Sequence, residues 1–336
     1  MKRLFVIATG LFLLLGCRDQ GPKEIFLSGE ALGTTYNIKY FSEEPIRFEE
    51  ALDSIIENVN ASMSTYIPDS DISRINDGDT SVVVDENFIR VFQASDKIYK
   101  ESQGVFDPTV GVLVNAYGFG PDKALKELDS LKLDSLKRLV GFDNIRLTTD
   151  QKIQKSSPAV YLDFNAIAKG FTIDLLGEYL EAKKVDNYLI ELGGELRARG
   201  INLEKDSTWI VGIDDPAQSN TERSLKAILK LENMAMATSG NYRKFRIDSV
   251  TGEKFVHTIN PISGKAVRSN LLSASVLADN CMLADGYATA FMALGLNRSK
   301  EMLSRVEGVE VYLIYSNENG EIEIYSSPGF QKQIIE

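Results

Sequence analysis

The chain has 336 residues, a net charge of -11, two cysteines and a single histidine. Hydrophobic residues make up 43% and charged residues 25%, values of an ordinary globular protein that exclude a disordered or fibrous chain. Negative net charge repels a phosphate backbone, so we expect no nucleic-acid partner. So few cysteines and histidines exclude the usual four-ligand zinc site, and we expect any metal to be a hard ion bound through oxygen.

The N-terminus has the pattern of an export signal. Lys2 and Arg3 precede an apolar run from Leu4 to Leu15, which is too short to span a bilayer. The sequence Leu14-Leu15-Gly16-Cys17 resembles a bacterial lipobox, in which the cysteine carries the acyl chains that anchor the mature protein. The alternative is an ordinary secretory signal followed by a chance cysteine.

This pattern divides the chain into three parts. We expect a signal peptide over 1–16, a lipid-anchored tether over 17–24 and one compact body over 25–336. With Cys17 acylated, Cys281 has no partner, so we expect no disulfide. The protein should therefore lie in the bacterial cell envelope, anchored to a membrane by lipid and facing the periplasm.

Periodicity predicts the elements of the body. Taken along the chain, they are strands over 25–32 and 35–41, helices around 48–59 and 88–99, a helix opening at 104–109, a polar helix over 128–140, a hairpin over 145–154, a helix over 166–180, strands over 187–192, 209–213, 225–231, 242–247 and 273–278, helices over 280–294 and 297–306, and strands over 309–315 and 321–325. Several adjacent strands in mixed order predict an α+β fold. We expect mainly antiparallel sheets with flanking helices, in one two-lobed unit.

Several common enzyme classes lack their motif here. No Gly-x-x-x-x-Gly-Lys-Ser/Thr loop occurs, which excludes a P-loop NTPase. Gly118-Phe119-Gly120 is followed by Lys123 where a dinucleotide fingerprint needs its third glycine. A serine hydrolase could use only His257 and has no Gly-x-Ser-x-Gly elbow. A thiol enzyme would depend on Cys281, which lies in an apolar segment that we expect to be buried.

The segment 281–294 is apolar or small on nearly every side, with Asp285 as its only charge. A buried, unpaired carboxylate costs several kcal/mol, so Asp285 needs a partner. Thr289 lies four residues on, on the same helical face. These two oxygens suit Mg²⁺, which takes few protein ligands and completes its shell with phosphate and water. The alternative is a salt bridge from Asp285 to an internal lysine, or a role of Asp285 as the cap of a loop, with Thr289 bonding back to its own helix.

A second polar cluster lies in Asp163-Phe-Asn-Ala-Ile-Ala-Lys-Gly170, at the predicted start of a helix. Free N–H groups and the helix dipole favour phosphate there, and Lys169 could contact it directly. Asp163 could instead be only the N-cap of that helix. Gly193-Gly194-Glu195 permits close approach of a ligand to the backbone, or forms a plain turn.

Taken together, these segments resemble the FAD:protein FMN transferase family, the ApbE-like flavin transferases of bacterial envelopes. The segments that carry the resemblance run in family order: 32–36 (LGTTY), 62–66 (SMSTY), 104–111 (GVFDPTVG), 117–120 (YGFG), 163–170 (DFNAIAKG), 191–195 (ELGGE), 237–242 (ATSGNY), 257–261 (HTINP) and 284–289 (ADGYAT).

The resemblance implies FAD in a cleft with Mg²⁺ on its diphosphate. The implied metal ligands are Asp285, Thr289 and the backbone carbonyl of Ala166. The implied FAD contacts are Leu32, Tyr66, Val105, Phe106, Asp107, Asp163, Lys169 and Ile259. Leu32 stands where the family pattern leads us to expect methionine, a volume-conserving change.

The implied reaction is transfer of FMN from FAD to a Ser or Thr hydroxyl of an acceptor protein, with release of AMP. Mg²⁺ and Lys169 would neutralise charge on the phosphates, and His257 is the candidate base, a role that Asp163 or Asp285 could share. The family suggests an electron-transport subunit as acceptor. The alternatives are an FAD pyrophosphatase that uses water as nucleophile, and a flavoprotein that only binds FAD.

Overall fold

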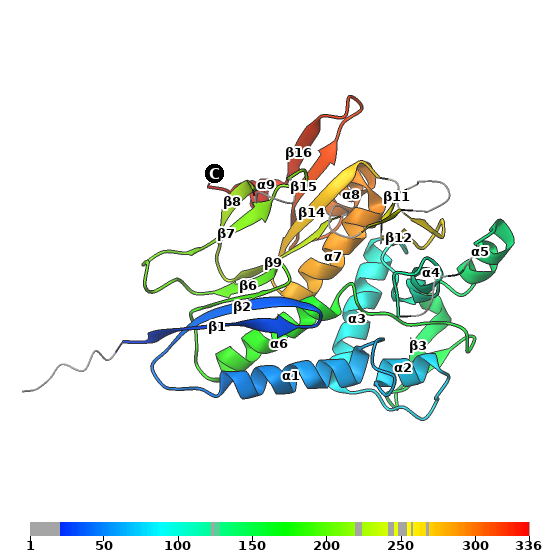
Figure 1. Cartoon of the computed structure of the whole chain (residues 1–336), viewed down its shortest axis with the longest axis horizontal. Helices are drawn as coiled ribbons and strands as arrows, with labels where there is room; N and C mark the ends of the chain where they lie inside the picture. The colour runs from blue at the N-terminus through cyan, green and yellow to red at the C-terminus, as the bar shows by residue number, and fades with distance from the viewer. Residues whose placement is uncertain are drawn as a thin grey trace, which may run out of the picture.

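The computed structural model describes residues 21–121, 125, 128–218, 224–240, 245–247, 254–256, 258–266 and 269–335. An antiparallel sheet of eight strands runs through the middle of the molecule (Figure 1). Across the sheet its strands are, in order, β1 (Lys23–Ala31), β2 (Thr34–Ser42), β5 (Tyr188–Leu192), β6 (Glu195–Arg199), β9 (Met234–Gly240), β14 (Leu271–Ala278), β15 (Glu310–Ser316) and β16 (Ile322–Ser326).

Four smaller antiparallel pairs and a set of helices complete the described fold. The pairs are β3 (Ile145–Leu147) with β4 (Ile153–Lys155), β7 (Trp209–Asp214) with β8 (Leu225–Leu231), β10 (Phe245–Ile247) with β11 (Lys254–Val256), and β12 (Ile259–Asn260) with β13 (Lys265–Ala266). The helices are α1 (Phe48–Met63), α2 (Asp71–Asn76), α3 (Glu86–Glu101), α4 (Gly111–Ala116), α5 (Ser130–Lys137), α6 (Ala168–Ala182), α7 (Cys281–Leu294), α8 (Leu296–Leu303) and α9 (Pro328–Gln331), with short 3-10 turns at Pro108–Val110 and Phe142–Asn144.

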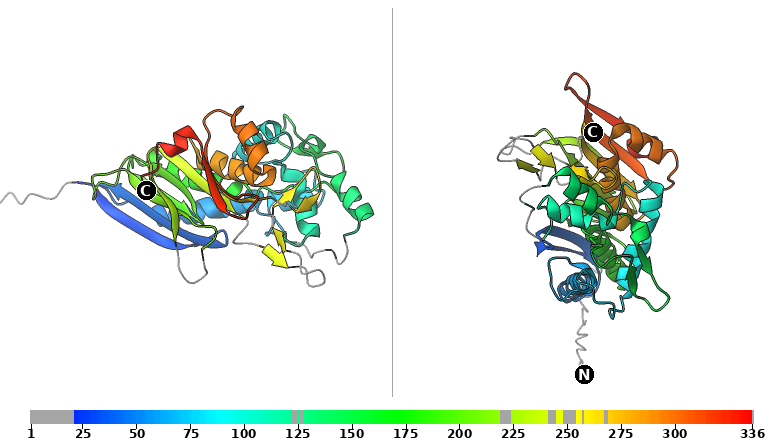
Figure 2. Two further views of the ribbon diagram at one scale, coloured as in Figure 1. Left: turned by 90° about the horizontal axis from the view of Figure 1, so that it is seen from above. Right: turned by 90° about the vertical axis from the view of Figure 1, so that its right-hand side faces the viewer.

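The two faces of the large sheet are covered differently. Helices α6 and α7 pack on one face, with α1 and α3 beyond them (Figures 1 and 2). The β7–β8 hairpin covers the other face, where Trp209, Leu229 and Phe330 from the C-terminal helix α9 share a buried cluster. Side chains of β5 and β6 therefore alternate between two cores, since successive residues of a strand point to opposite faces.

Strand β14 and helix α7 form the centre of this arrangement. Nearly all of β14 is buried because it lies between β9 and β15 with apolar groups on both faces, which explains its continuous apolar sequence. Helix α7 begins where the side chain of Asn280 accepts a hydrogen bond from the N–H of Leu283 at 2.9 Å, and it ends at Gly295, whose φ is 74°. An N-cap and a left-handed glycine are the usual boundaries of a helix.

The predicted α+β fold with a mainly antiparallel sheet is confirmed, and most predicted elements occur within two or three residues of their expected bounds. Helix α6 begins at Ala168, two residues later than expected. Strands β6, β9, β11, β12 and β13 were not predicted, and neither were helices α2 and α9. Of the predicted strand 242–247, residues 242–244 lie outside the described residues. No helix in the described ranges is long and apolar enough to cross a bilayer.

Candidate functional site

The site is built where the first turn of α6 meets α7. The N–H of Gly170 donates a hydrogen bond to Oδ2 of Asp285 at 3.0 Å. A Cβ on residue 170 would lie 2.3 Å from the carbonyl oxygen of Cys281, a backbone atom that cannot easily move. Only glycine therefore lets the two helices approach closely enough for this contact.

Asp285 is buried, as its apolar helix predicted, with 5% of its surface exposed. Burial raises the pKa of its carboxyl, while the nearby charge of Lys169 acts in the opposite direction. Among the described residues, Lys169 nevertheless makes its ion pair with Glu195, with Nζ 2.5 Å from Oε2, and none with Asp285. The alternative of a simple salt bridge from Asp285 to this lysine is therefore wrong.

Glu195 and Lys169 form the charged part of the site together with Asp285. Glu195 is the first residue of β6 and has only 4% of its surface exposed. Burial, and after it the negative charge of Asp285, raises the pKa of the Glu195 carboxyl. Although burial lowers the pKa of Lys169, the charges of Glu195 and Asp285 raise it overall. The positive charge of Lys169 thus acts on two buried carboxylates, although it forms an ion pair with one of them.

The Gly193-Gly194 turn brings the backbone against this cluster. The N–H of Gly193 donates to the carbonyl of Thr35 at 2.9 Å, which fixes the turn beside the start of β2. A Cβ on Gly193, whose φ is 64°, would lie 2.7 Å from Cγ2 of Thr34 and 3.3 Å from Nζ of Lys169. Segments 32–36, 163–170, 191–195 and 284–289, which carry much of the family resemblance, therefore meet at one place.

The oxygen atoms predicted as metal ligands suit a hard cation. The N–H of Gly170 would bond to the carbonyl of Ala166 in a longer helix, but it donates to Asp285, so this carbonyl is left out of the helical pattern. Oγ1 of Thr289 lies 3.4 Å from Oγ of Ser239 on β9, and either hydroxyl can donate in this contact. A carboxylate, a hydroxyl and a carbonyl are ligands that Mg²⁺ accepts. In the described part of the chain, no three His, Cys, Asp or Glu residues cluster as a metal site.

Asp163 lies next to the 104–111 segment. Its N–H donates to the carbonyl of Pro108 at 2.8 Å, and a Cβ on Gly111 would lie 3.2 Å from Cβ of Asp163. Its Oδ1 accepts from the N–H of Asn165 at 2.7 Å, while Ile167 occupies the cap position of α6. The alternative role of Asp163 as the helix cap is therefore wrong.

Tyr66 and Asp163 are close enough to interact electrostatically. Burial, and after it the charge of Asp163, raises the pKa of the Tyr66 hydroxyl. The side-chain amide of Asn165 also donates to Oγ1 of Thr65 at 3.3 Å, which links the two loops. Tyr66 itself has 61% of its surface exposed. An aromatic ring that the protein leaves uncovered at a site edge is available to stack on a flat ligand.

The remaining predicted contacts occupy different environments. Asp107 is buried, and its Oδ1 accepts from both the N–H and the hydroxyl of Thr109, at 2.8 and 2.6 Å. Burial raises the pKa of Asp107 to about 6. Val105 and Phe106 are also buried, the latter in the helical core.

Two further predicted contacts lie at turns. Leu32 lies in the β1–β2 turn with a φ of 50°, and Ile259 is buried in β12, which packs on α7. Their roles as FAD contacts stay predictions. The candidate base His257 and the candidate lipidation site Cys17 lie outside the described residues.

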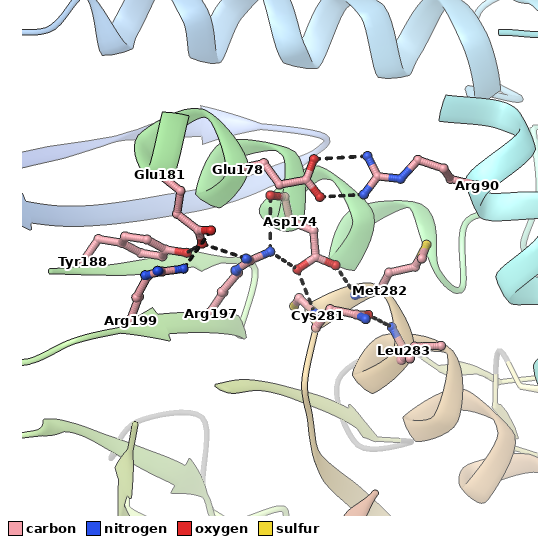
Figure 3. A network of polar contacts seen from close by, with 11 residues as sticks. Arg90, Asp174, Glu178, Glu181, Tyr188, Arg197, Arg199, Cys281, Met282 and Leu283 are labelled. Atoms are coloured by element: carbon pink, nitrogen blue, oxygen red, sulfur yellow. Dashed lines mark hydrogen bonds and ion pairs between the residues drawn. The ribbon is translucent and has the colours of Figure 1, made fainter. Parts of the chain in front are cut away.

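A network of ion pairs further along α6 holds the two helices in place (Figure 3). Asp174 accepts hydrogen bonds from the N–H groups of Cys281 and Met282 at 2.9 and 2.8 Å, and it pairs with Arg197 at 2.8 Å. Arg197 also pairs with Glu181 at 2.8 Å. Since Asp174 sits one turn along α6 from Gly170, it fixes the start of α7 and thereby the position of Asp285.

Sequence reasoning missed three of the residues that shape the site. Glu195 lies in the segment 191–195, where the sequence predicts only a glycine turn. Ser239 lay in the segment 237–242, which received no role. Asp174 gave no separate signal, since it is one of three acidic residues of α6, with Glu178 and Glu181 one and two turns further along.

Comparison with known proteins gives one consistent result. The model of the ApbE family matches residues 32–313. The FAD:protein FMN transferases of Haemophilus influenzae and Vibrio cholerae are 36% and 32% identical to this chain, covering 99% and 98% of it and 98% of each relative. The flavin transferase ApbE from Vibrio cholerae superposes with a TM-score of 0.82 at 31% identity, over 93% of this chain and 99% of that one. The apo flavinyl transferase ApbE of Pseudomonas stutzeri gives 0.81 at 26% identity, over 93% and 97%.

Proposed function

Because the chain belongs to the ApbE family, we propose that it transfers the FMN moiety of FAD to a Ser or Thr hydroxyl of an acceptor protein, with release of AMP. The observation that carries this proposal is the meeting of Lys169, Glu195 and Asp285 beside the Gly193-Gly194 turn. That meeting places a cation for phosphate beside Asp285, a carboxylate that can bind a metal, next to a glycine turn.

Mg²⁺ is the metal that these ligands fit. Asp285, Thr289 and the carbonyl of Ala166 would hold it. When bound, the ion neutralises charge on the diphosphate of FAD and stabilises the charge that grows there during transfer. The other oxygen of Asp285, Oδ1, accepts no hydrogen bond from the described residues, which supports its use as a ligand.

The protein's own groups then position and polarise the substrate. The acceptor hydroxyl oxygen attacks the phosphorus on the FMN side, and the bond from that phosphorus to the bridging oxygen breaks, so AMP leaves with that oxygen. The ammonium of Lys169 donates to phosphate oxygens, and Asp163 and Asp107 orient the flavin end of FAD. His257 accepts the proton of the attacking hydroxyl, a role suited to a side chain that titrates near neutral pH. Catalysis of this kind depends chiefly on position and electrostatics.

The substrate contacts form two groups. Leu32, Val105, Phe106 and Ile259 supply the apolar side of the flavin site. Tyr66 covers the flavin ring and limits the access of water once FAD is bound, which favours transfer to a protein over hydrolysis.

We also propose that the protein acts in the bacterial envelope, anchored by lipid on Cys17 and facing the periplasm. The lipobox-like sequence supports this, together with the short distance in sequence from Cys17 to the first strand at Lys23. The acceptor is then an envelope protein with a flavinylation motif, and an electron-transport subunit is the class we propose.

The test is an incubation of the purified protein with FAD, Mg²⁺ and an acceptor domain that carries a Thr-containing motif. We expect flavin fluorescence on the acceptor band in a gel and one AMP for each flavin transferred. An acceptor whose motif Thr is replaced by Val is the matched control. AMP and free FMN without labelled acceptor would instead indicate an FAD pyrophosphatase. Absence of AMP would indicate a protein that only binds FAD.

A further inference from the structure

We propose that Glu195 is a positioning residue that holds the ammonium of Lys169 away from Asp285 and so keeps Asp285 available for the metal. This inference rests on the proposed function, because it concerns the same metal site. Glu195 touches neither the substrate nor the metal in this scheme. It acts through Lys169.

The geometry gives Lys169 two possible partners. Its Nζ lies 2.5 Å from Oε2 of Glu195. Lys169 is also the neighbour of Gly170, whose N–H bonds to Asp285, so the lysine side chain starts beside the second carboxylate. In the described part of the chain, the ion pair of Lys169 is made with Glu195 and not with Asp285.

Glu195 is the fixed member of this pair. Its side chain is 6% exposed and that of Lys169 is 28% exposed. Glu195 opens β6 directly after the Gly193-Gly194 turn and pairs across to Leu192 of β5, so its backbone has little freedom. A lysine has a long flexible stem. The position of the ammonium therefore follows from where Glu195 puts it.

Loss of the Glu195 charge should let Lys169 turn to Asp285. A buried carboxylate without a cation is costly, so the freed ammonium and the Asp285 carboxylate would pair. A metal would then have to displace the lysine before it could bind. Residues that orient metal ligands usually change metal affinity by about 10–100-fold when they are replaced.

The test measures Mn²⁺ binding in place of Mg²⁺, from the electron paramagnetic resonance signal of the free ion, on the purified full chain in detergent with FAD. We expect Glu195→Gln to weaken Mn²⁺ binding about 10–100-fold. In a protein that also carries Lys169→Met, the same change should alter the affinity by less than about twofold, because the competing ammonium is gone.

A matched control separates this effect from loss of any carboxylate. Glu178→Gln makes the same change on α6, in the exposed pair with Arg90, and should leave Mn²⁺ affinity unchanged. Glu195→Asp keeps the charge but shortens its reach, and should weaken binding in the same direction as Glu195→Gln. This second variant also tests the inference if Glu195→Gln folds poorly.

Equal weakening by Glu195→Gln with and without Lys169→Met would overturn the inference, since Glu195 would then act only through its charge. Unchanged affinity in both Glu195 variants would overturn it as well. These results would leave the proposed function standing. If the unsubstituted protein bound Mn²⁺ no better than Asp285→Ala, the proposed metal site itself would be wrong, and the inference would fall with it.

Discussion

The two ends of helix α6 carry charged side chains in opposite situations. Towards its C-terminal end, Asp174, Glu178 and Glu181 each pair with an arginine, at distances between 2.5 and 2.8 Å (Figure 3). The hydroxyl of Tyr188 also donates to Glu181 at 2.7 Å. Although burial raises the pKa of Glu181, this hydrogen bond and the arginine charges lower it overall.

At the N-terminal end of α6, one lysine faces two carboxylates. Lys169 pairs with Glu195, and among the described residues Asp285 accepts a hydrogen bond only from the N–H of Gly170. The pKa of both carboxyls is raised, chiefly by burial. This difference indicates that paired charges hold the helices together, while the unbalanced set lies where we propose that a cation and a phosphate bind.

Removing the unbalanced carboxylate should have the largest effect on activity. We expect Asp285→Ala to lower AMP release by about 10⁴-fold or more, equal to about 5 kcal/mol, because the metal loses its charged ligand. Stability should change little, since the loss of one hydrogen bond is offset by relief of repulsion with Glu195. AMP is measured by chromatography, with Asp279→Ala, an exposed carboxylate before α7, as control. Normal turnover by Asp285→Ala would show that the metal is held elsewhere.

Replacing Asp174, in the paired network towards the C-terminal end of α6, should lower stability most. Asp174→Ala leaves Arg197 partly uncompensated and removes the acceptor of two N–H groups of α7. We expect a loss of about 3–5 kcal/mol in the free energy of unfolding, measured by urea denaturation. A loss below about 1 kcal/mol would mean that this network does not hold α7.

Asp107 is a third kind of buried carboxylate, because it accepts hydrogen bonds from Thr109. Burial raises its pKa from the ordinary value of 3.8 to about 6 in the folded protein. The folded protein therefore stays protonated at Asp107 to a higher pH than the unfolded chain. The free energy of unfolding should fall by up to about 3 kcal/mol as the pH rises from about 4 to about 7. Unfolding curves at several pH values for the unsubstituted protein and Asp107→Asn test this. Parallel pH profiles would contradict it.

The smallest effect on stability is expected at the pair of Glu178 with Arg90, which is the exposed part of the network. Arg90 donates two hydrogen bonds to Glu178, but the side chains are 34% and 44% exposed, so solvent screens the pair. Glu178→Ala should cost about 0.2–1 kcal/mol of unfolding free energy. A larger cost, by urea denaturation in parallel with Asp174→Ala, would show that the whole network acts as one unit.

Sequence patterns predicted the elements whose own residues determine them. Helix α7 follows from an apolar sequence with an asparagine cap and a terminal glycine, and its single carboxylate marked the site. Strand β9 was missed because four of the seven residues of Met234–Gly240 are alanine, serine or glycine, and only Thr238 has a strong strand preference. It is a strand because it lies between β6 and β14, and such tertiary context overrides local propensity.

The sequence predicted several residues of the site, but not which of them contact one another. Asp285, Thr289 and Lys169 were singled out by residue type and spacing. The pairing of Lys169 with Glu195 depends on a strand, β6, in which Leu196 and Ala198 alternate with charged residues over only five positions, too short a pattern to be predicted. Contacts between residues far apart in sequence require the fold, which is why the second carboxylate was not assigned a role.

Because the N–H of Gly170 donates to Asp285, its amide proton should respond to changes in the charge around that carboxylate. An N–H bonded to a carboxylate has a chemical shift that depends on the charge of that carboxylate. A cation bound at Asp285 would draw electron density away from Oδ2 and weaken the bond from Gly170. In a nuclear magnetic resonance spectrum, the signal of this single glycine would therefore report whether the site is filled, without any label placed in it.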